Sequence, residues 1–232
     1  FGVRALVVDV DPDTMRADPD AMAAAVDEGT VLVVGSAPSY AHGVIDPIPE
    51  LAAMAAGRGI RCHVDACIGG WVLPHLDDVP PWTFAVPGVT SISVDLHKYA
   101  YTPKGVSVVL HRTAALRRSH FFASADWPGY TMLNTTMQST KSGGPLAAAW
   151  AVTHRIGLGG YRDLARQARR ATLELTEAAR AIDVALFVGL GREAAIPLYH
   201  LAGLRSDLLL EAGEVETLSP IRLRYTGRLV DL

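Results

Sequence analysis

Short runs of Val, Ile and Leu alternate with helix-start signals along the first 112 residues of the chain. The apolar runs have the length of buried strands, and the Asp-Pro pairs at Asp18 and Asp46 are typical of helix starts. The predicted strands are residues 3–10, 30–34, 61–65, 90–94 and 105–110, and the predicted helices are residues 19–26 and 48–56. Strands separated by helices of this length need crossover connections, so we expect an α/β fold with a mostly parallel sheet and flanking helices.

The pattern changes in the second half of the chain. Residues 114–120 predict a short helix, and residues 121–144 predict a long loop rich in polar and aromatic residues. Loops of this length in compact domains usually serve a function or are disordered. Two strong helices are then predicted over residues 145–156 and 161–181, and the glycine-rich residues 157–160 end the first of them.

Composition narrows the class of protein. Among the 232 residues, 50% are hydrophobic and 19% are charged, which excludes disorder, collagen-like repeats and a coiled coil. The formal charge of -3 gives no sign of a nucleic-acid partner, and no apolar run approaches the roughly 18 residues of a membrane span. The two cysteines are too few for a disulfide framework and suit a reducing compartment, so we expect a cytoplasmic protein. Because the chain opens on Phe1 and runs straight into a predicted strand, we expect it to be a piece of something longer.

Polar side chains follow three predicted strands at the points where the strands end. Ser36 follows the second strand, Asp65 ends the third, and Asp95, His97 and Lys98 follow the fourth. Ligands gather at the carboxyl ends of strands in sheets of this kind, and a charged group there is costly unless it is paired or used.

One carboxylate and one lysine on neighbouring strand ends suit pyridoxal phosphate. Its aldehyde condenses with a lysine amine, and its ring nitrogen needs a carboxylate to stay protonated. Asp65 and Lys98 could instead form a structural ion pair, or could each cap a strand end independently. The spacing alone leaves these interpretations open, because the pattern is short.

Two other constellations are weaker. A zinc site would use Cys62, His63, Cys67 and His97, but the paired Cys-x-x-Cys spacing is missing, so we expect no metal. A hydrolase would use Ser36, His42 and Asp46, but no Gly-x-Ser-x-Gly elbow surrounds the serine.

Three segments, in order along the chain, carry a family resemblance. They are residues 35–48 (GSAPSYAHGVIDPI), 63–70 (HVDACIGG) and 88–105 (GVTSISVDLHKYAYTPKG). These segments resemble the pyridoxal-phosphate-dependent (group II) decarboxylase family, and in particular its sphingosine-1-phosphate lyase branch. The resemblance implies the large domain of a fold-type I enzyme with its N-terminal part missing.

The resemblance also implies roles for single residues. Lys98 matches the lysine that bonds covalently to pyridoxal phosphate, and Asp65 matches the carboxylate that binds the pyridine nitrogen. His97 matches a histidine that helps to hold the cofactor phosphate, Ser36 lies in the loop that lines the ring, and Lys104 matches a second lysine near the substrate. A desolvated, cation-rich cofactor site is expected to lower the pKa of Lys98 from about 10.4.

The expected reaction follows from the same resemblance. It is the retro-aldol cleavage of a phosphorylated amino alcohol, with amino-acid decarboxylation and a non-catalytic fragment as alternatives; the parent enzyme is expected to be a homodimer. Thr140 and Lys141 align with a substrate phosphate pocket where lyases carry serine and arginine, and lysine lacks the bidentate fork of arginine. The expected organisation is residues 1–145 as a partial cofactor-binding domain, 146–182 as linking helices and 183–232 as a divergent or truncated C-terminal segment.

Overall fold

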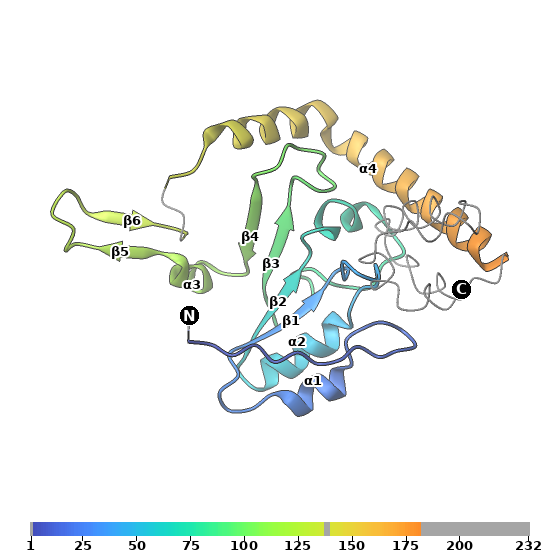
Figure 1. The fold of residues 1–232 in the computed structure, drawn as a ribbon, viewed down its shortest axis with the longest axis horizontal. Coiled ribbons are helices and arrows are strands. Elements are labelled where there is room, and N and C mark those ends of the chain that lie inside the picture. Colours follow the sequence, from blue (N-terminus) through green and yellow to red (C-terminus); the bar gives the residue numbers. More distant parts are fainter. Residues whose placement is uncertain (1, 137–139, 182–232) are drawn as a thin grey trace, which may run out of the picture.

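The computed structural model describes residues 2–136 and 140–181 (Figure 1). Four strands form the central sheet in the order β1-β2-β3-β4. Their bounds are Leu32–Ser36, Arg61–Asp65, Val89–Asp95 and Ser107–His111. The first three strands are parallel and β4 runs antiparallel to β3, which confirms the expected mostly parallel sheet.

Two helices cover one face of this sheet (Figure 1). Helix α1 (Pro19–Ala25) begins as predicted, because the Asp18 side chain accepts hydrogen bonds from two backbone N–H groups of the first turn. Helix α2 (Ile48–Gly57) packs Ile48 and Leu51, both fully buried, against β1 and β2. Burial of each side chain contributes about 2 kcal/mol to folding, which makes this layer the core of the molecule.

A third and much longer helix, α4 (Gly143–Ala181), crosses the end of the sheet where β1, β2 and β3 terminate (Figure 1). Helix α4 is broken at Gly157, where φ is 64° and ψ is 172°, so the predicted break between two helices is confirmed. Beyond the break, the Tyr161 hydroxyl donates a hydrogen bond of 2.8 Å to the carbonyl of Ala100, and its ring packs against that of Trp71, tilted by 45° with the ring centroids 4.9 Å apart. These contacts hold the helix over the strand ends.

Short elements connect the main ones. The 3₁₀ helices η1 (Gly69–Trp71) and η2 (Leu73–His75) follow β2, and α3 (Ala114–Arg117) with η3 (Arg118–His120) follows β4. The predicted short helix after β4 is therefore confirmed. Gly69 has no room for a side chain, since a Cβ there would lie 2.2 Å from the carbonyl oxygen of Ala37, and the loops after β1 and β2 touch at this point.

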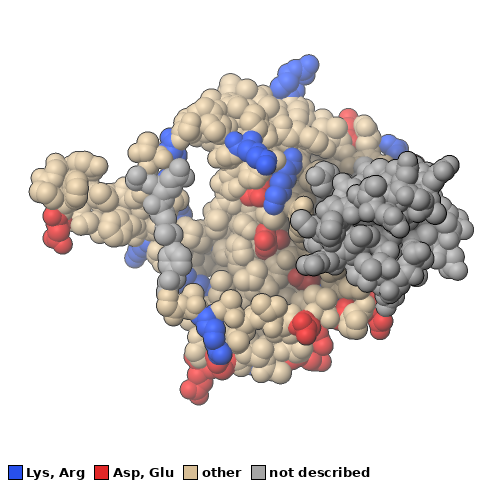
Figure 2. Space-filling model, in the orientation of Figure 1, with Lys and Arg blue, Asp and Glu red and all other residues tan. Residues whose placement is uncertain are grey.

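The predicted long loop contains a hairpin instead. Strands β5 (Phe122–Ser124) and β6 (Met132–Asn134) pair antiparallel and project from the body (Figures 1 and 2). The prediction failed because each strand is only three residues long and contains no fully buried position, so the sequence pattern is too short to indicate a strand.

The first predicted strand is also wrong. Residues 2–9 have no regular structure, and Val10 forms only an isolated bridge with Ala17. An apolar run becomes a strand only when a partner strand is available, and no described strand lies beside this run.

Among the described residues, no helix is both long enough and apolar enough to cross a membrane. The expected C-terminal segment, residues 183–232, lies outside the described residues.

Candidate active site

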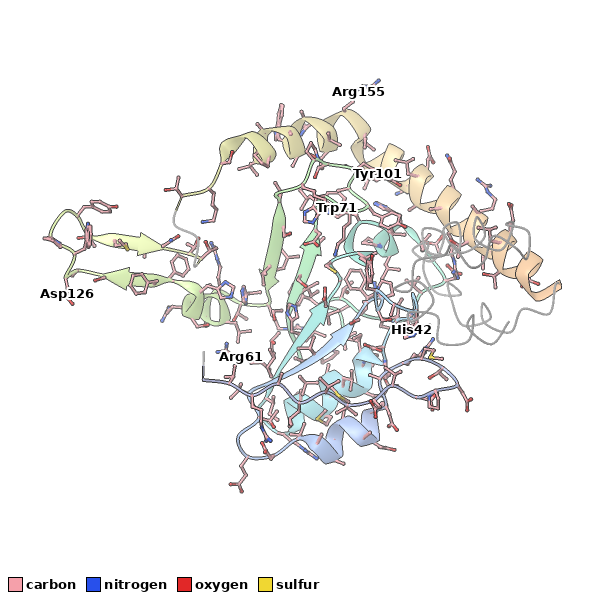
Figure 3. All side chains as sticks on the ribbon, viewed as in Figure 1. His42, Arg61, Trp71, Tyr101, Asp126 and Arg155 are labelled. Carbon is pink, nitrogen blue, oxygen red and sulfur yellow. The ribbon has the colours of Figure 1, made fainter. Side chains whose placement is uncertain are left out.

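The strand register brings the predicted site residues to one edge of the sheet. Ser36 pairs with Asp65, and Asp65 pairs with Ser93, so three neighbouring strands end side by side. Figure 3 labels Trp71 and Tyr101 on this side of the molecule, below α4, and Arg61 at the opposite end of β2. The expected gathering of polar groups at the carboxyl ends is confirmed for Ser36, Asp65 and the residues after β3.

Asp65 is a partly buried carboxylate with two directed donors. Its Oδ1 atom accepts from the backbone N–H of Cys67 at 3.0 Å and from the Ser93 hydroxyl at 3.1 Å. Burial alone would raise the pKa of Asp65, but the hydrogen bonds from Cys67 and Ser93 outweigh it and hold the pKa below its ordinary value of 3.8. The carboxylate is therefore ionised at neutral pH, as its expected role requires.

Lys98 lies beside a different carboxylate. Its Nζ atom is 2.8 Å from Oδ2 of Asp95 and 2.9 Å from Sγ of Cys67. Burial on its own would lower the pKa of Lys98, but the hydrogen bonds to Asp95 and Cys67 outweigh it and raise the pKa above 10.5. The expected lowering of the lysine pKa is thus reversed in this structure, because an anion and not a cation is its nearest charged neighbour.

Asp95 was expected at this strand end, but its pairing with Lys98 was not predicted. Burial on its own would raise the pKa of Asp95, but the hydrogen bonds from Lys98 and Ser107 outweigh it and hold the pKa below its ordinary value of 3.8. The signal was present in the sequence, since Asp95 ends β3 and Lys98 follows it by three residues. Within the described residues, no ion pair joins Lys98 to Asp65. The structural ion pair considered for these two residues therefore does not form, and Lys98 pairs with Asp95 instead.

Cys67 connects the two halves of the site. Its N–H donates to the carboxylate of Asp65 while its sulfur accepts from the ammonium of Lys98. Burial raises the pKa of the Cys67 thiol, so it stays protonated at neutral pH. One residue thus touches both the amine and the carboxylate that the cofactor hypothesis requires.

His97 faces the backbone next to β4. Its Nδ1–H donates to the carbonyl of Val106 at 3.1 Å, because a carbonyl oxygen only accepts, and Nε2 lies 3.6 Å from Oδ2 of Asp95. The ring is therefore held at the same strand end as Lys98, and its expected contact with a cofactor phosphate stays a prediction.

Ser36 is positioned through a buried aspartate. Asp46 is only 8% exposed and accepts hydrogen bonds from the backbone N–H groups of Ser36 at 2.7 Å and Ala17 at 2.9 Å. The helix predicted after Asp46-Pro47 is confirmed, since α2 begins at Ile48, but the Asp46 side chain does not cap it: the N-cap residue is Pro47, without a side-chain hydrogen bond. The carboxylate instead ties the loop after β1 to the segment before α1.

The remaining predicted residues lie on exposed segments. Lys104 precedes Gly105, where φ is 120° and a Cβ would lie 3.1 Å from the Pro145 side chain. This close approach places the loop of Lys104 against the first turn of α4, shortly after the exposed residues Thr140 and Lys141. The expected substrate contacts of these three residues stay predictions.

Solved structures define the class of fold. The chain is similar to a sphingosine-1-phosphate lyase from Burkholderia pseudomallei, with 42% identity and a TM-score of 0.72 over 74% of this chain and 40% of that one. It is similar in fold to a glutamate decarboxylase from Lactobacillus brevis, with a TM-score of 0.64 and 23% identity over the same shares. The fold is therefore that of pyridoxal-phosphate-dependent decarboxylases and lyases.

Sequence comparison then places the chain in its family. The model of the pyridoxal-dependent decarboxylase conserved domain matches residues 1–181, and the chain belongs to this family. It is 39% identical to a sphingosine-1-phosphate lyase from Dictyostelium discoideum and 40% identical to one from Arabidopsis thaliana, over 81% and 82% of its own length. It spans about a third of the length of these relatives, 36% and 35% respectively.

The family implies pyridoxal phosphate as the cofactor, and the residues present fit it. Lys98 offers an amine, and Asp65 offers an ionised carboxylate for a ring nitrogen; both lie at neighbouring strand ends in contact with Cys67. No cluster of three or more metal-ligating side chains occurs among the described residues.

Proposed function

We propose that this chain belongs to a pyridoxal-phosphate-dependent lyase that cleaves a phosphorylated amino alcohol between two carbons. The amine of Lys98 and the ionised carboxylate of Asp65, held on either side of Cys67, are the observation that carries the proposal. About 40% identity to proteins named sphingosine-1-phosphate lyase supports this reaction over others of the family. When bound, pyridoxal phosphate supplies an aldehyde that bonds an amine and a protonated ring that accepts an electron pair.

Each site residue then has a defined task. Asp65 holds the proton on the ring nitrogen, because its lowered pKa keeps it anionic. Lys98 must first lose a proton before its amine can act as a nucleophile, and the adjacent Asp95 keeps that proton in place until the site fills. As a free amine, Lys98 is then a base for the substrate hydroxyl.

The overall reaction balances without an oxidant or reductant. The hydroxyl proton leaves, the bond between the hydroxyl carbon and the amine-bearing carbon breaks, and the hydroxyl carbon departs as an aldehyde. The amine-bearing carbon takes up a proton, and the second product is an amino phosphate. Lys104 and Lys141 would bind the phosphate by charge, as exposed lysines beside the same turn of α4.

Amino-acid decarboxylation is the second candidate. The observation that favours it is Lys141, because lysine offers a point charge where a phosphate is better held by the planar fork of arginine. The same Lys98 and Asp65 would serve either reaction.

Cofactor attachment tests the proposal. Pyridoxal phosphate is added to the purified chain, the mixture is reduced with borohydride, and the labelled peptide is mapped. We expect the label on Lys98, no label in Lys98→Ala, and unchanged labelling in the matched control Lys104→Ala. Full labelling of Lys98→Ala would overturn the assignment.

Product analysis separates the candidate reactions. A long-chain phosphorylated amino alcohol should yield an aldehyde, whereas a decarboxylase would release carbon dioxide from amino acids. Labelling at Lys98 without either product would favour a binding-competent but non-catalytic chain.

We also propose that the parent enzyme is a cytoplasmic homodimer. The support is the two free cysteines and the exposed apolar side chains of the β5–β6 hairpin, which a second copy would cover. Sedimentation equilibrium of the purified protein tests the dimer, since a monomer at all concentrations would contradict it.

A further inference from the structure

A line of hydrogen-bonded side chains runs behind the carboxylate of Asp65. The Ser93 hydroxyl donates to Asp65 at 3.1 Å, and Nε2 of His63 lies 3.1 Å from the same hydroxyl. Nδ1 of His63 lies 2.8 Å from the hydroxyl of Ser91. We call these four residues, Ser91, His63, Ser93 and Asp65, the relay; they alternate between β3 and β2 on one face of the sheet.

The direction of every hydrogen bond in the relay follows from counting donors. An ionised carboxylate only accepts, so the single hydroxyl proton of Ser93 points to Asp65. The Ser93 oxygen must therefore accept from His63, which places a proton on Nε2. A neutral imidazole with Nε2–H has a lone pair on Nδ1, so Ser91 donates there. All three protons point toward Asp65.

The surroundings of His63 keep the imidazole neutral. Burial lowers the pKa of His63, and the opposing attraction of Asp65 is the smaller effect. The strand pairing places uncharged residues on both sides of His63, Val34 on β1 and Ser91 on β3. Ser91 in turn pairs with His111 on β4. Arg61 precedes His63 on the same strand face, and His111 interacts electrostatically with both Arg61 and His63.

We propose that His63 is a positioning residue that makes Ser93 donate to Asp65 and thereby keeps that carboxylate anionic and in one orientation for the ring nitrogen of the cofactor. The part that concerns the cofactor rests on the function proposed above. The tautomer of His63 and the protonation of Asp65 do not, because both are properties of the chain alone.

The tautomer is tested first, on the wild-type chain without cofactor. Nitrogen-15 NMR of histidine-labelled protein distinguishes a protonated from an unprotonated ring nitrogen, and His63 is assigned by its absence in His63→Gln. We expect Nε2 protonated and Nδ1 bare at neutral pH. A His63 ring protonated at Nδ1 alone, or at both nitrogens, would overturn the relay whatever the chain binds.

Two variants then test the effect on Asp65. His63→Phe keeps the ring shape and removes both nitrogens, whereas His63→Gln keeps a donor and an acceptor. We expect a higher carboxyl pKa for Asp65 in His63→Phe, measured by carbon-13 NMR, and recovery toward wild type in His63→Gln. Thr90→Val is the matched control, because the Thr90 hydroxyl donates to the backbone of Cys62 and not to the relay. An unchanged Asp65 pKa in folded His63→Phe contradicts the proposal.

Cofactor affinity gives the functional readout. Pyridoxal phosphate is compared with its deaza analogue, in which carbon replaces the ring nitrogen, by equilibrium dialysis. We expect His63→Phe to weaken pyridoxal phosphate about tenfold and to leave the analogue unchanged, since a hydrogen bond to a charged group is of this order. Equal weakening of both ligands would mean a merely structural role and would refute the proposal. If wild type binds neither ligand, the function proposed for this chain fails, while the NMR result still decides the relay.

Discussion

The strand-end site and the β5–β6 hairpin occupy opposite extremes of this molecule. At the strand ends, polar side chains are partly buried and several have two or more partners: Asp65 has two donors, and Lys98 contacts both a carboxylate and a thiol. In the hairpin, large apolar side chains are exposed, with Leu133 at 65% and Trp127 at 51%. Figure 2 shows the visible surface of the hairpin as mostly uncharged.

The site and the hairpin are held in place differently. The described hydrogen bonds and ion pairs of the site join β1, β2 and β3 and the loops that follow them. The hairpin has only three paired residues in each strand and few contacts with the body, so its stabilisation must come from elsewhere. Substitutions in the body should therefore have large effects on folding, and substitutions in the hairpin small ones.

The largest effect is expected in the core that supports the site. Leu51 is fully buried between α2 and the sheet, and Leu51→Ala would leave a cavity there. We expect a loss of about 3 kcal/mol in the free energy of unfolding. Urea denaturation followed by circular dichroism measures it, and a loss below about 1 kcal/mol would mean that this layer is not well packed.

A smaller loss is expected at the loop that holds Ser36. Asp46→Ala would leave the partly buried N–H groups of Ser36 and Ala17 without an acceptor, at a cost of about 2 kcal/mol. Asp27→Ala is the matched control, because Asp27 also accepts two hydrogen bonds, from Gly29 and Thr30, but on an exposed turn. Equal losses in the two variants would show that burial of Asp46 is unimportant.

The sequence predicted the parts of this comparison that depend on local pattern. Strand β2 and helix α2 appear almost at the predicted bounds, because apolar periodicity and Asp-Pro or glycine signals act within a few residues. The true partners of Lys98 and Asp46 were missed, because side-chain pairing depends on where loops meet in space. The hairpin was missed for the opposite reason, since no buried face imposes a pattern on it.

An intermediate effect is expected from pH. Burial holds the pKa of His63 below its ordinary value of 6.5, so the unfolded chain takes up a proton that the folded chain does not. Stability should therefore fall as pH drops from about 7.5 through 6.5 toward the folded pKa, and level off below it. His63→Gln should lose this part of the profile. Urea denaturation of both proteins between pH about 7.5 and 5 measures the difference, and parallel profiles would show that His63 is not held neutral.

The smallest effect is expected from the same leucine-to-alanine change placed in the hairpin. Leu133 pairs with Ala123 across the two strands and is mostly exposed, so its truncation leaves no cavity in the chain by itself. We expect Leu133→Ala to change the free energy of unfolding by no more than about 0.5 kcal/mol, against about 3 kcal/mol for Leu51→Ala. The measurement is repeated over a range of protein concentrations, because a second copy that covers the hairpin would make the loss grow with concentration. A loss in Leu133→Ala that matches the core variant at every concentration would end the distinction between the two regions, since the hairpin would then be packed as tightly as the sheet.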